Sequence, residues 1–291
     1  MKKKKWPVLL AALCLLAVWC ARGVWVSYHD PVVRRWEVPL DTLTVPVRAA
    51  VLADLHDRDF DEGNQTLLDL TAAAEPDLIL LAGDLLNDVS PDSHVVTELV
   101  ESLTAIAPVY FAWGNHELDY MTAGHEALAA EVEAAGAVIL EKNWVDLTVN
   151  GAELRLGGLY GYAFAQDDHN TCDPARMDPE VYQFLTDYQD TDRCKILLSH
   201  RPDSFALGEA SATWEVDLVI SGHDHGGQVV LPLLGGLYGG DQGFFPEYVH
   251  GIYEKDNIRL AITSGLGSQQ QRLPRFRNPP EIMVLDLTPG T

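Results

Sequence analysis

The sequence predicts an α/β protein in which two packed β-sheets are covered by helices, behind an apolar N-terminal segment. Three observations favour this fold. The chain has 291 residues, 47% of them hydrophobic, which is ample for a large single core. From Val47 onward, apolar runs alternate with stretches of helical period. In the last third of the chain, apolar runs follow one another without helices between them.

The first segment, residues 1–28, is predicted to be a membrane anchor or a signal segment. Four lysines precede the uninterrupted apolar run Trp6–Ala21, and the run continues through Val26 if Arg22 extends its charge to the membrane surface. The lysines should stay cytoplasmic, so the rest of the chain is expected outside the cytoplasm, held at the cell membrane. A cleaved signal peptide is the alternative and would release a secreted protein, although bulky Trp19 occupies a position that cleavage sites give to a small residue.

Charge and cysteine content limit the partners. The 43 acidic residues outnumber the 20 basic ones and give a formal net charge of −23. A surface this negative repels polyanions, so nucleic acid is not expected as a partner. Cys172 and Cys194 flank a polar segment of the body, where they form either one disulfide or two free thiols.

Residues 47–140 contain four predicted strands and three predicted helices in alternation. Each strand is an apolar run, and the third helix is closed by a glycine. Helical crossovers between strands predict a largely parallel sheet with helices on its faces. The strands lie within 47–56, 76–87, 108–117 and 137–140, and the helices span 64–74, 93–107 and 124–136.

The second half of the chain has a different pattern. Hydrophobicity alternates around Asn150-Gly151, which is a strong signal for a β-hairpin. No stretch is rich enough in proline and glycine to divide the body, so we expect one domain, residues 47–288. Its remaining elements are predicted as the hairpin at 144–160, a helix at 179–189, strands that end at His200 and Ser221, and strands within 257–267 and 280–290.

Polar side chains with ligand chemistry follow five of these strands. Because ligands bind at the carboxyl ends of strands in an open α/β sheet, we expect the five strand ends to form one site. A single Asp-x-His pair would be weak support, but five strand ends that all supply Asp, Asn or His indicate a metal site. The residues are Asp54, His56, Asp84, Asn115, His116, His200, His223 and His225.

The types and number of these residues indicate the metal. Imidazole, carboxylate and amide oxygen without thiolate suit Mn²⁺, Fe or Zn²⁺, with Mn²⁺ favoured. Seven protein ligands are too many for one ion and fit two divalent ions that share a carboxylate, with His116 left over. Two ions about 3.5–4 Å apart form a clamp for in-line displacement at phosphorus.

The same blocks resemble the five motifs of the calcineurin-like metallophosphoesterases, in the order of that family. Two further stretches, GHDHGGQ and the terminal GLG…PRFRNPPEI, resemble a membrane-associated bacterial branch that includes UDP-2,3-diacylglucosamine pyrophosphatase-like phosphoesterases. Asn87 departs from the family pattern, which often has Asp there at a position that is usually not a ligand. The five blocks are Asp54-Leu55-His56, Gly83-Asp84-Leu85-Leu86-Asn87, Gly114-Asn115-His116-Glu117, Ser199-His200 and Gly222-His223-Asp224-His225.

The resemblance implies a fold, a ligand set and a mechanism. It implies a four-layer α-β-β-α metallophosphoesterase sandwich in which a hydroxide between two metals attacks phosphorus. His116 would face the leaving-group oxygen, as a proton donor or as a charge on the transition state. Asp54, His56 and His225 would hold one metal, Asn115, His200 and His223 the other, and Asp84 would bridge them.

The backbone around these ligands supports two further expectations. Gly83, Gly114 and Gly222 are expected to permit the tight turns between the strands and the ligands. Asp224 is expected to point away from His223 and His225, because side chains alternate along an extended backbone.

The expected activity is a metal-dependent phosphoesterase tethered to the membrane and facing outward. Its expected substrate is a phosphodiester or pyrophosphate, lipid-linked or resembling a sugar nucleotide. A phosphoprotein phosphatase or cyclic nucleotide phosphodiesterase is the alternative among enzymes, and a non-catalytic metal-binding scaffold is the alternative outside them.

Two segments outside the motifs carry open interpretations. The aromatic segment 233–253 is either a hairpin that contributes to the core or an apolar lid for an acyl chain. Arg272, Arg275 and Arg277 form a basic cluster that either binds substrate phosphate or is a solvated loop.

Overall fold

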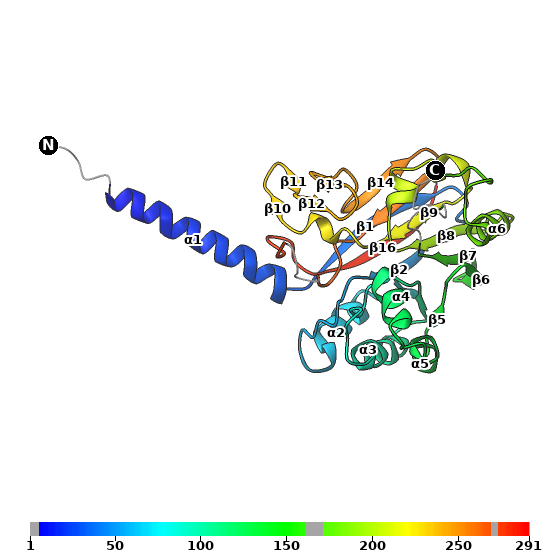
Figure 1. The fold of residues 1–291 in the computed structure, drawn as a ribbon, viewed down its shortest axis with the longest axis horizontal. Coiled ribbons are helices and arrows are strands. Elements are labelled where there is room, and N and C mark those ends of the chain that lie inside the picture. Colours follow the sequence, from blue (N-terminus) through cyan, green and yellow to red (C-terminus); the bar gives the residue numbers. More distant parts are fainter. Residues whose placement is uncertain (1–5, 161–163, 165–170, 269–272, 291) are drawn as a thin grey trace.

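The computed structural model of the chain describes residues 6–160, 164, 171–268 and 273–290. Helix α1 (Trp6–His29) projects from the body as a single rod (Figure 1), and nearly all of its side chains are exposed. Near the end of the helix, Gly23 and Ser27 are buried against the body, and Val26 and Tyr28 are half-buried. By length and composition α1 could cross a membrane, and a signal sequence would pass the same test.

The first sheet has six strands in the order β1-β16-β2-β3-β4-β5. The strands from β2 to β5 run parallel, as predicted, because helices connect them. The strands are β1 (Val32–Leu40), β2 (Val47–Leu52), β3 (Leu78–Leu81), β4 (Val109–Phe111), β5 (Val138–Ile139) and β16 (Glu281–Pro289). The helices of this half are η1 (Glu62–Asn64), α2 (Gln65–Ala73), α3 (His94–Thr104), α4 (Asn115–Thr122) and α5 (Leu128–Ala134).

The second sheet also has six strands, in the order β14-β15-β9-β8-β7-β6. The predicted hairpin is confirmed: β6 and β7 are antiparallel, and Asn150 (φ 54°) and Gly151 (φ 94°) both adopt the left-handed conformation that a two-residue turn requires. The strands are β6 (Asn143–Val149), β7 (Ala152–Leu159), β8 (Cys194–Ser199), β9 (Leu218–Ser221), β14 (Gly251–Lys255) and β15 (Ile258–Ile262). The helices here are α6 (Pro179–Tyr188), α7 (Asp203–Ala206) and α8 (Ala210–Thr213).

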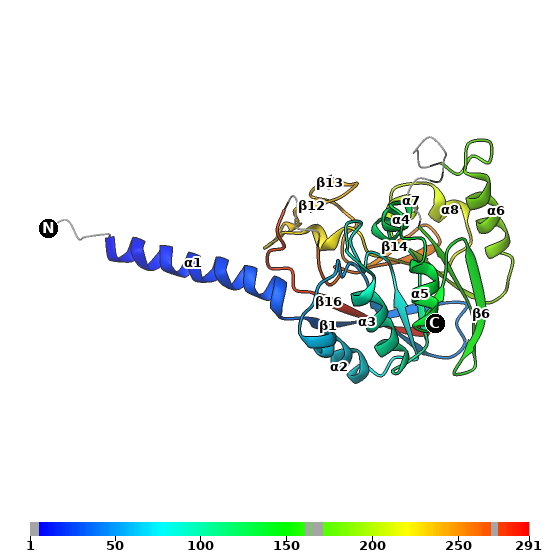
Figure 2. The same cartoon turned by 60° about the horizontal axis from the view of Figure 1, so that its bottom comes forward.

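Three buried clusters define four layers. One cluster lies between the two sheets and contains Val51 and Leu80 from the first sheet and Leu198 and Ile220 from the second. Another packs α2, α3 and α5 against the outer face of the first sheet. The third packs α6, α7 and α8 against the outer face of the second sheet. The described part of the body is therefore a mixed α/β sandwich, with helices outside both sheets as the sequence predicts (Figures 1 and 2).

Most of the aromatic segment that follows the site lies outside the core, although Val249 is buried and Tyr248 and Tyr253 pack against the third cluster. It forms two small hairpins whose tip side chains are exposed, so the core interpretation of residues 233–253 is wrong for most of the segment. The hairpins consist of β10 (Val230–Leu231) with β11 (Gly235–Gly236) and β12 (Tyr238–Gly239) with β13 (Gly243–Phe244), after the short helix η2 (His225–Gly227).

The start of the domain differs from its prediction, and the structure decides between the two interpretations of the cysteine pair. Strand β1 precedes residue 47, the predicted start of the domain, yet it pairs with β16 along its whole length and buries Val38 and Leu40. Cys172 and Cys194 are free thiols, and the disulfide interpretation is wrong. Cys194 is buried between the sheets and Cys172 packs at the third cluster, so they lie in different layers.

Candidate metal centre

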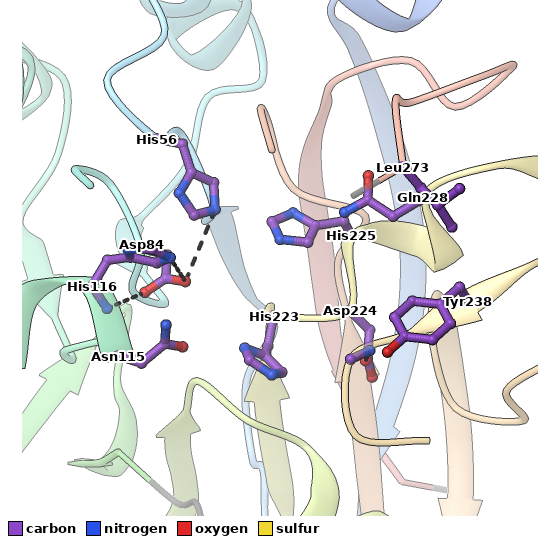
Figure 3. Close-up of a pocket in the computed structure, with 11 residues that line it drawn as sticks. His56, Asp84, Asn115, His116, His223, Asp224, His225, Gln228, Tyr238 and Leu273 are labelled. Carbon is purple, nitrogen blue, oxygen red and sulfur yellow. Dashed lines mark hydrogen bonds and ion pairs between the residues drawn. The ribbon is translucent and has the colours of Figure 1, made fainter. Parts of the chain in front are cut away.

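The predicted ligands meet where the carboxyl ends of the two sheets face each other. Strands β2, β3 and β4 of the first sheet are followed by Asp54, Asp84 and Asn115. Strands β8 and β9 of the second sheet are followed by His200 and His223. The site is thus built from two sheet edges rather than from a single edge. A cavity of about 260 Å³ opens there, and its lining includes His56, Asp84, Asn115, His116, His223 and His225 (Figure 3).

Asp84 lies at the centre of the arrangement. Its Oδ2 is 3.2 Å from Nε2 of His200 and 3.9 Å from Nε2 of His56. Its Oδ1 accepts a hydrogen bond of 2.9 Å from the backbone N–H of His116. One carboxylate therefore faces imidazoles from both sheets, which is the position that a shared ligand requires.

Asp54 organises the other side. It is fully buried, and its carboxylate accepts hydrogen bonds of 3.0 and 3.2 Å from the backbone N–H of His223. Its Oδ1 is 3.9 Å from Nδ1 of His225. Three triads have ligand atoms that all lie within 4.8 Å of one another, a spacing that one ion could span. They are Asp54-His56-His225, His56-Asp84-His116 and Asp84-His200-His223.

The chemistry of the buried atoms fits metal ions. Nε2 of His56, Oδ1 of Asn115 and Nδ1 of His225 are buried and have no hydrogen-bond partner among the residues that the structure describes. Buried polar atoms without partners are costly, and a cation bound between them removes that cost. Nδ1 of His56 contacts Oδ1 of Asn87 at 3.0 Å, so Asn87 orients the ring and leaves Nε2 for an ion.

The electrostatics of the site keep the imidazoles on its open side neutral. Burial lowers the pKa of His56 to about 4, and it lowers the pKa values of His223 and His225 well below the usual range. Neutral imidazole is the form that binds a cation. Burial also raises the pKa of Asp54 to about 7, because the surrounding protein supplies too little positive charge to stabilise its carboxylate.

His200 and Asp84 form a tightly coupled pair. Burial works against charge on His200, but the neighbouring Asp84 carboxylate outweighs it and raises the pKa of His200 to about 9. Burial alone would raise the pKa of Asp84, but the imidazoles around it hold that pKa well below its usual range. Because metal ligands must be deprotonated, an ion that binds at His200 would displace a proton from this ring.

The ligands themselves make the tight turns. Asp54, His56, Asp84, His223 and His225 all have φ between 47° and 71°, which is uncommon for residues other than glycine. Such strain persists only where the surrounding structure imposes it, and it is common at functional sites.

Of the three glycines expected to permit these turns, Gly83 has φ 88°, whereas Gly114 and Gly222 are not in the left-handed region. Gly114 is needed for close approach instead, because a Cβ there would lie 2.1 Å from Oδ1 of Asp84.

Glu117 holds the first-sheet turns together, a role that the sequence did not reveal. Its buried carboxylate accepts hydrogen bonds from the backbone N–H of Asp84 at 2.8 Å, Leu85 at 2.7 Å and Gly114 at 2.8 Å. The turn after β3 is thereby tied to the turn after β4. Glu117 belongs to the motif Gly114-Asn115-His116-Glu117, but only the folded structure shows which backbone N–H groups donate to its carboxylate.

Two more carboxylates orient histidines and were also missed. Asp88 contacts Nδ1 of His116 through its carboxylate at 3.1 Å and through its backbone N–H at 3.2 Å. Asp241, at the second small hairpin, lies 3.0 Å from Nε2 of His223 and pairs with Arg201. Partners of this kind fix the ring orientation of ligating and catalytic histidines.

The side chain of Asp224 points away from His223 and His225 as predicted, but alternation along an extended strand is not the reason. The backbone there is a turn and not an extended strand, with φ −83° and ψ −1° at Asp224. The carboxylate is turned instead by hydrogen bonds from Gly240 N–H at 2.9 Å and from Nε2 of Gln242 at 2.8 Å. It is displaced toward Tyr238 and away from the two imidazoles (Figure 3).

Arg275 fits neither a solvated loop nor an exposed phosphate contact, the two interpretations of the basic cluster, because it lies inside the protein. Its guanidinium is fully buried and donates to the carbonyl oxygens of five residues, at distances from 2.7 to 3.2 Å. Arg275 is therefore the centre of the loop before β16. Arg277 lies over the ring of Trp19 in α1, and Arg272 is outside the described residues. The five acceptors are Ser264, Gly265, Gly267, Asn278 and Pro279.

Comparisons with known proteins show the family of this chain. The family model described as calcineurin-like phosphoesterase matches residues 47–227. A Caenorhabditis elegans protein named as a metallophosphoesterase is 29% identical over 239 residues, which cover 79% of this chain and 47% of the relative. The chain thus spans about half the length of that relative.

A second relative matches over most of both chains. Phosphodiesterase YaeI of Escherichia coli is 26% identical over 249 residues, which cover 83% of this chain and 82% of YaeI. Among solved structures, the 5′-nucleotidase precursor from Thermus thermophilus aligns with 76% of this chain and 50% of its own, at 16% identity and a TM-score of 0.47.

Proposed function

The chain belongs to the calcineurin-like phosphoesterase family and is a metal-dependent phosphoester hydrolase, and we propose that it uses two divalent ions held between its sheets. The observation that carries this proposal is the set of buried, unpartnered ligand atoms around Asp84. Two of the triads, Asp54-His56-His225 and Asp84-His200-His223, share no residue, so we assign one ion to each. Mn²⁺ is the ion that we propose first, because imidazole, carboxylate and amide oxygen suit it.

Each ion would take ligands from both sheets. We assign Asp54, His56 and His225 to one ion, Asn115, His200 and His223 to the other, and Asp84 to both. When bound, the two ions would supply an activated water and neutralise charge on the phosphate. The protein's own contribution is to hold seven ligands in place by the strained turns, Glu117 and the orienting contacts of Asn87 and Asp241.

His116 is the proposed catalytic residue outside the ligand set. Its side chain lines the cavity, and Asp88 holds its Nδ1. Its Nε2 then points to the side of the site where Oδ2 of Asp84 lies 3.9 Å away. From that position His116 would donate a proton, or a hydrogen bond, to the leaving-group oxygen of the substrate.

We propose that α1 is an uncleaved membrane anchor and that the body lies outside the cytoplasm. Its 24 residues extend about 36 Å as an α-helix, enough to cross a hydrocarbon core of about 30 Å. The end of α1 is packed against the body: buried Ser27 accepts a hydrogen bond of 3.0 Å from the backbone N–H of Asn278. Cleavage before this point would remove part of the packed structure.

The proposed substrate is a phosphodiester or pyrophosphate linked to a lipid or shaped like a sugar nucleotide. Two features support it: the E. coli relative is named a phosphodiesterase, and an anchored body meets lipid-linked substrates at the membrane surface. Within the family we propose the membrane-associated branch of UDP-2,3-diacylglucosamine pyrophosphatase-like enzymes, because of the GHDHGGQ block and the terminal PRFRNPPEI block.

Hydrolysis by the purified full chain tests the two-ion proposal. The chain in detergent should hydrolyse bis-p-nitrophenyl phosphate when Mn²⁺ is added. Asp84→Asn removes the shared negative ligand and should lower kcat/KM by at least about 10³-fold. Asp69→Asn, an exposed acid on α2, serves as the matched control and should keep wild-type activity. Wild-type activity in Asp84→Asn would contradict the mechanism.

A further inference from the structure

The two small hairpins carry four exposed apolar side chains, two in the turn of the first hairpin and two at the end of the second. Leu233 is fully exposed, and Leu234, Phe244 and Phe245 are each more than half exposed. Clustered large apolar groups in contact with water are unusual for a soluble surface and mark an interaction site. We refer to these four residues as the hairpin tips.

The backbone of the hairpin tips makes their composition more unusual. Leu233 has φ 69° and Phe245 has φ 56°, both in the left-handed region. Glycine, asparagine or aspartate would fit these turn positions with less strain and better solvation. A turn at Leu233 and a bend at Phe245 gain nothing from leucine or phenylalanine if their only task is to redirect the chain, so these side chains indicate contact with an apolar phase.

The hairpins are joined to the membrane-facing end of α1 through Phe276. Phe276 packs edge-on against Trp19, with ring centroids 5.2 Å apart, and it fills the space beside Gly23. It also pairs with the first hairpin, because Val230 donates its N–H to the carbonyl oxygen of Phe276 at 2.9 Å. In Figures 1 and 2 the hairpins lie at the end of the body from which α1 departs.

The position of these contacts along α1 sets the level of the membrane. Trp6 and Trp25 are exposed and about 28 Å apart along the helix, close to the separation of the two aromatic belts of a bilayer. Phe276 contacts α1 at Trp19 and Gly23, which lie between Trp6 and Trp25 and therefore on the membrane side of Trp25. Arg22 and Arg277 line a groove of about 400 Å³ beside these contacts, and their long side chains would extend from it toward the lipid phosphates at the membrane surface.

We propose that the hairpin tips insert into the outer leaflet of the bilayer that α1 crosses, and that the metal centre therefore opens directly onto the lipid surface. The proposal rests on the proposed function, because it takes α1 as a membrane anchor. Its occupant is the lipid bilayer itself, since the hairpin tips are joined through Phe276 to the stretch of α1 that lies within the apolar layer.

The hairpins connect this lipid contact with the cavity. Tyr238 and Leu273 line the cavity beside His223 and His225. The ring of Tyr238 packs edge-on against that of exposed Phe244, with centroids 5.3 Å apart. An apolar path thus leads from the hairpin tips to the metal ligands. The substrate class that fits it is a phosphoester whose acyl chains remain in the bilayer while its phosphate reaches the site.

Photo-cross-linking tests the membrane contact without any need for activity. The full chain is placed in phosphatidylcholine vesicles that contain phosphatidylcholine with a diazirine in its acyl chain, and cross-linked peptides are mapped by mass spectrometry. We expect cross-links in α1 and within residues 230–246. Leu207, an exposed leucine that follows α7, should remain unlabelled. Cross-links confined to α1, with none within residues 230–246, would overturn the proposal.

Charged variants of the first hairpin give the functional test. Leu233→Asp with Leu234→Asp suits the turn backbone but opposes insertion, and it should lower labelling of 230–246 about tenfold. The same variant should lower turnover of a diacyl p-nitrophenyl phosphodiester in the vesicles about tenfold and leave turnover of soluble bis-p-nitrophenyl phosphate within twofold. Leu207→Asp is the matched control and should change neither activity.

The two proposals fail in different ways. If the wild-type chain hydrolyses neither compound, the proposed function fails, whereas the cross-linking result still stands on its own. If the double variant lowers both activities equally, or keeps full labelling and full turnover in vesicles, the hairpin tips do not connect the metal centre to lipid.

Discussion

At the scale of single residues, His116 is proposed to act in the chemistry and not as a metal ligand. It is held by Asp88, and although it lies close enough to His56 and Asp84 to share an ion with them, it falls outside the proposed seven-ligand set. His116→Asn should therefore keep the bound metal and lower kcat by about 10²–10⁴-fold, the range of a lost general acid. Metal content by elemental analysis and kcat on bis-p-nitrophenyl phosphate check both parts. Loss of metal would make His116 a ligand and would refute this role.

Asp88 provides the matched test of orientation. Asp88→Asn keeps the size of the side chain but removes the charge beside Nδ1 of His116. A positioning role predicts a smaller loss of kcat than in His116→Asn, a shifted pH profile of kcat, and little further loss when the two substitutions are combined. Fully multiplicative losses would mean that the two residues act independently.

Arg275 illustrates a residue whose role depends on burial rather than on type. Because its guanidinium bonds to five carbonyls inside the protein, Arg275→Met should lower the free energy of unfolding by about 3–5 kcal/mol. Urea unfolding of the full chain in detergent measures this loss. Arg259→Met, at a partly exposed arginine of β15, is the control. An unchanged stability with a raised KM would restore the substrate-binding interpretation.

At the scale of elements, Glu281 ties β16 to its surroundings. Its carboxylate accepts hydrogen bonds from the N–H and Oγ of Ser264 at 3.0 and 2.7 Å, and it lies 2.8 Å from Nε2 of His250. Nη1 of Arg34 in β1 lies 3.4 Å from the same carboxylate and forms an ion pair with it. Burial alone would raise its pKa, but His250 and Arg34 outweigh burial and lower the pKa of Glu281 to about 2.

This lowered pKa predicts a pH dependence of stability. A carboxylate whose folded-state pKa lies below its ordinary value of 4.5 stabilises the fold above pH 4.5 and loses that contribution as the pH falls toward 2. The contribution amounts to about 3 kcal/mol. Glu281→Gln should therefore destabilise the chain at pH 7 but much less at pH 3, as measured by urea unfolding. Exposed Glu153→Gln is the control, and an equal loss at both pH values would contradict the assignment.

The elements also show what the sequence pattern could predict. Helices α2, α3, α5 and α6 and the β6–β7 hairpin follow from local period and from Asn150-Gly151, because local physics decides them. Strand β1 was not predicted, since Arg34, Arg35 and Glu37 interrupt its apolar residues. Its pairing with β16 depends on a strand from the far end of the chain. Contacts of that kind have no local signature.

At the scale of the whole molecule, the proposed metal centre depends on the face-to-face packing of the two sheets. The ligand types could be predicted, since each follows an apolar strand. The supporting residues Glu117, Asp88 and Asp241 could not, because their partners lie on other elements. The same holds for the left-handed backbone of the ligands and for the hairpin tips, whose exposure depends on the packing of everything around them.

The central claim is that seven residues from two sheets hold two ions. A crystal structure of the full chain grown with Mn²⁺, with anomalous scattering recorded at the manganese edge, tests it most directly. We predict two anomalous peaks about 3.5–4 Å apart. One should lie among Asp54, His56 and His225, the other among Asn115, His200 and His223, and Asp84 should contact both. A single peak, or peaks away from Asp84, would contradict the account.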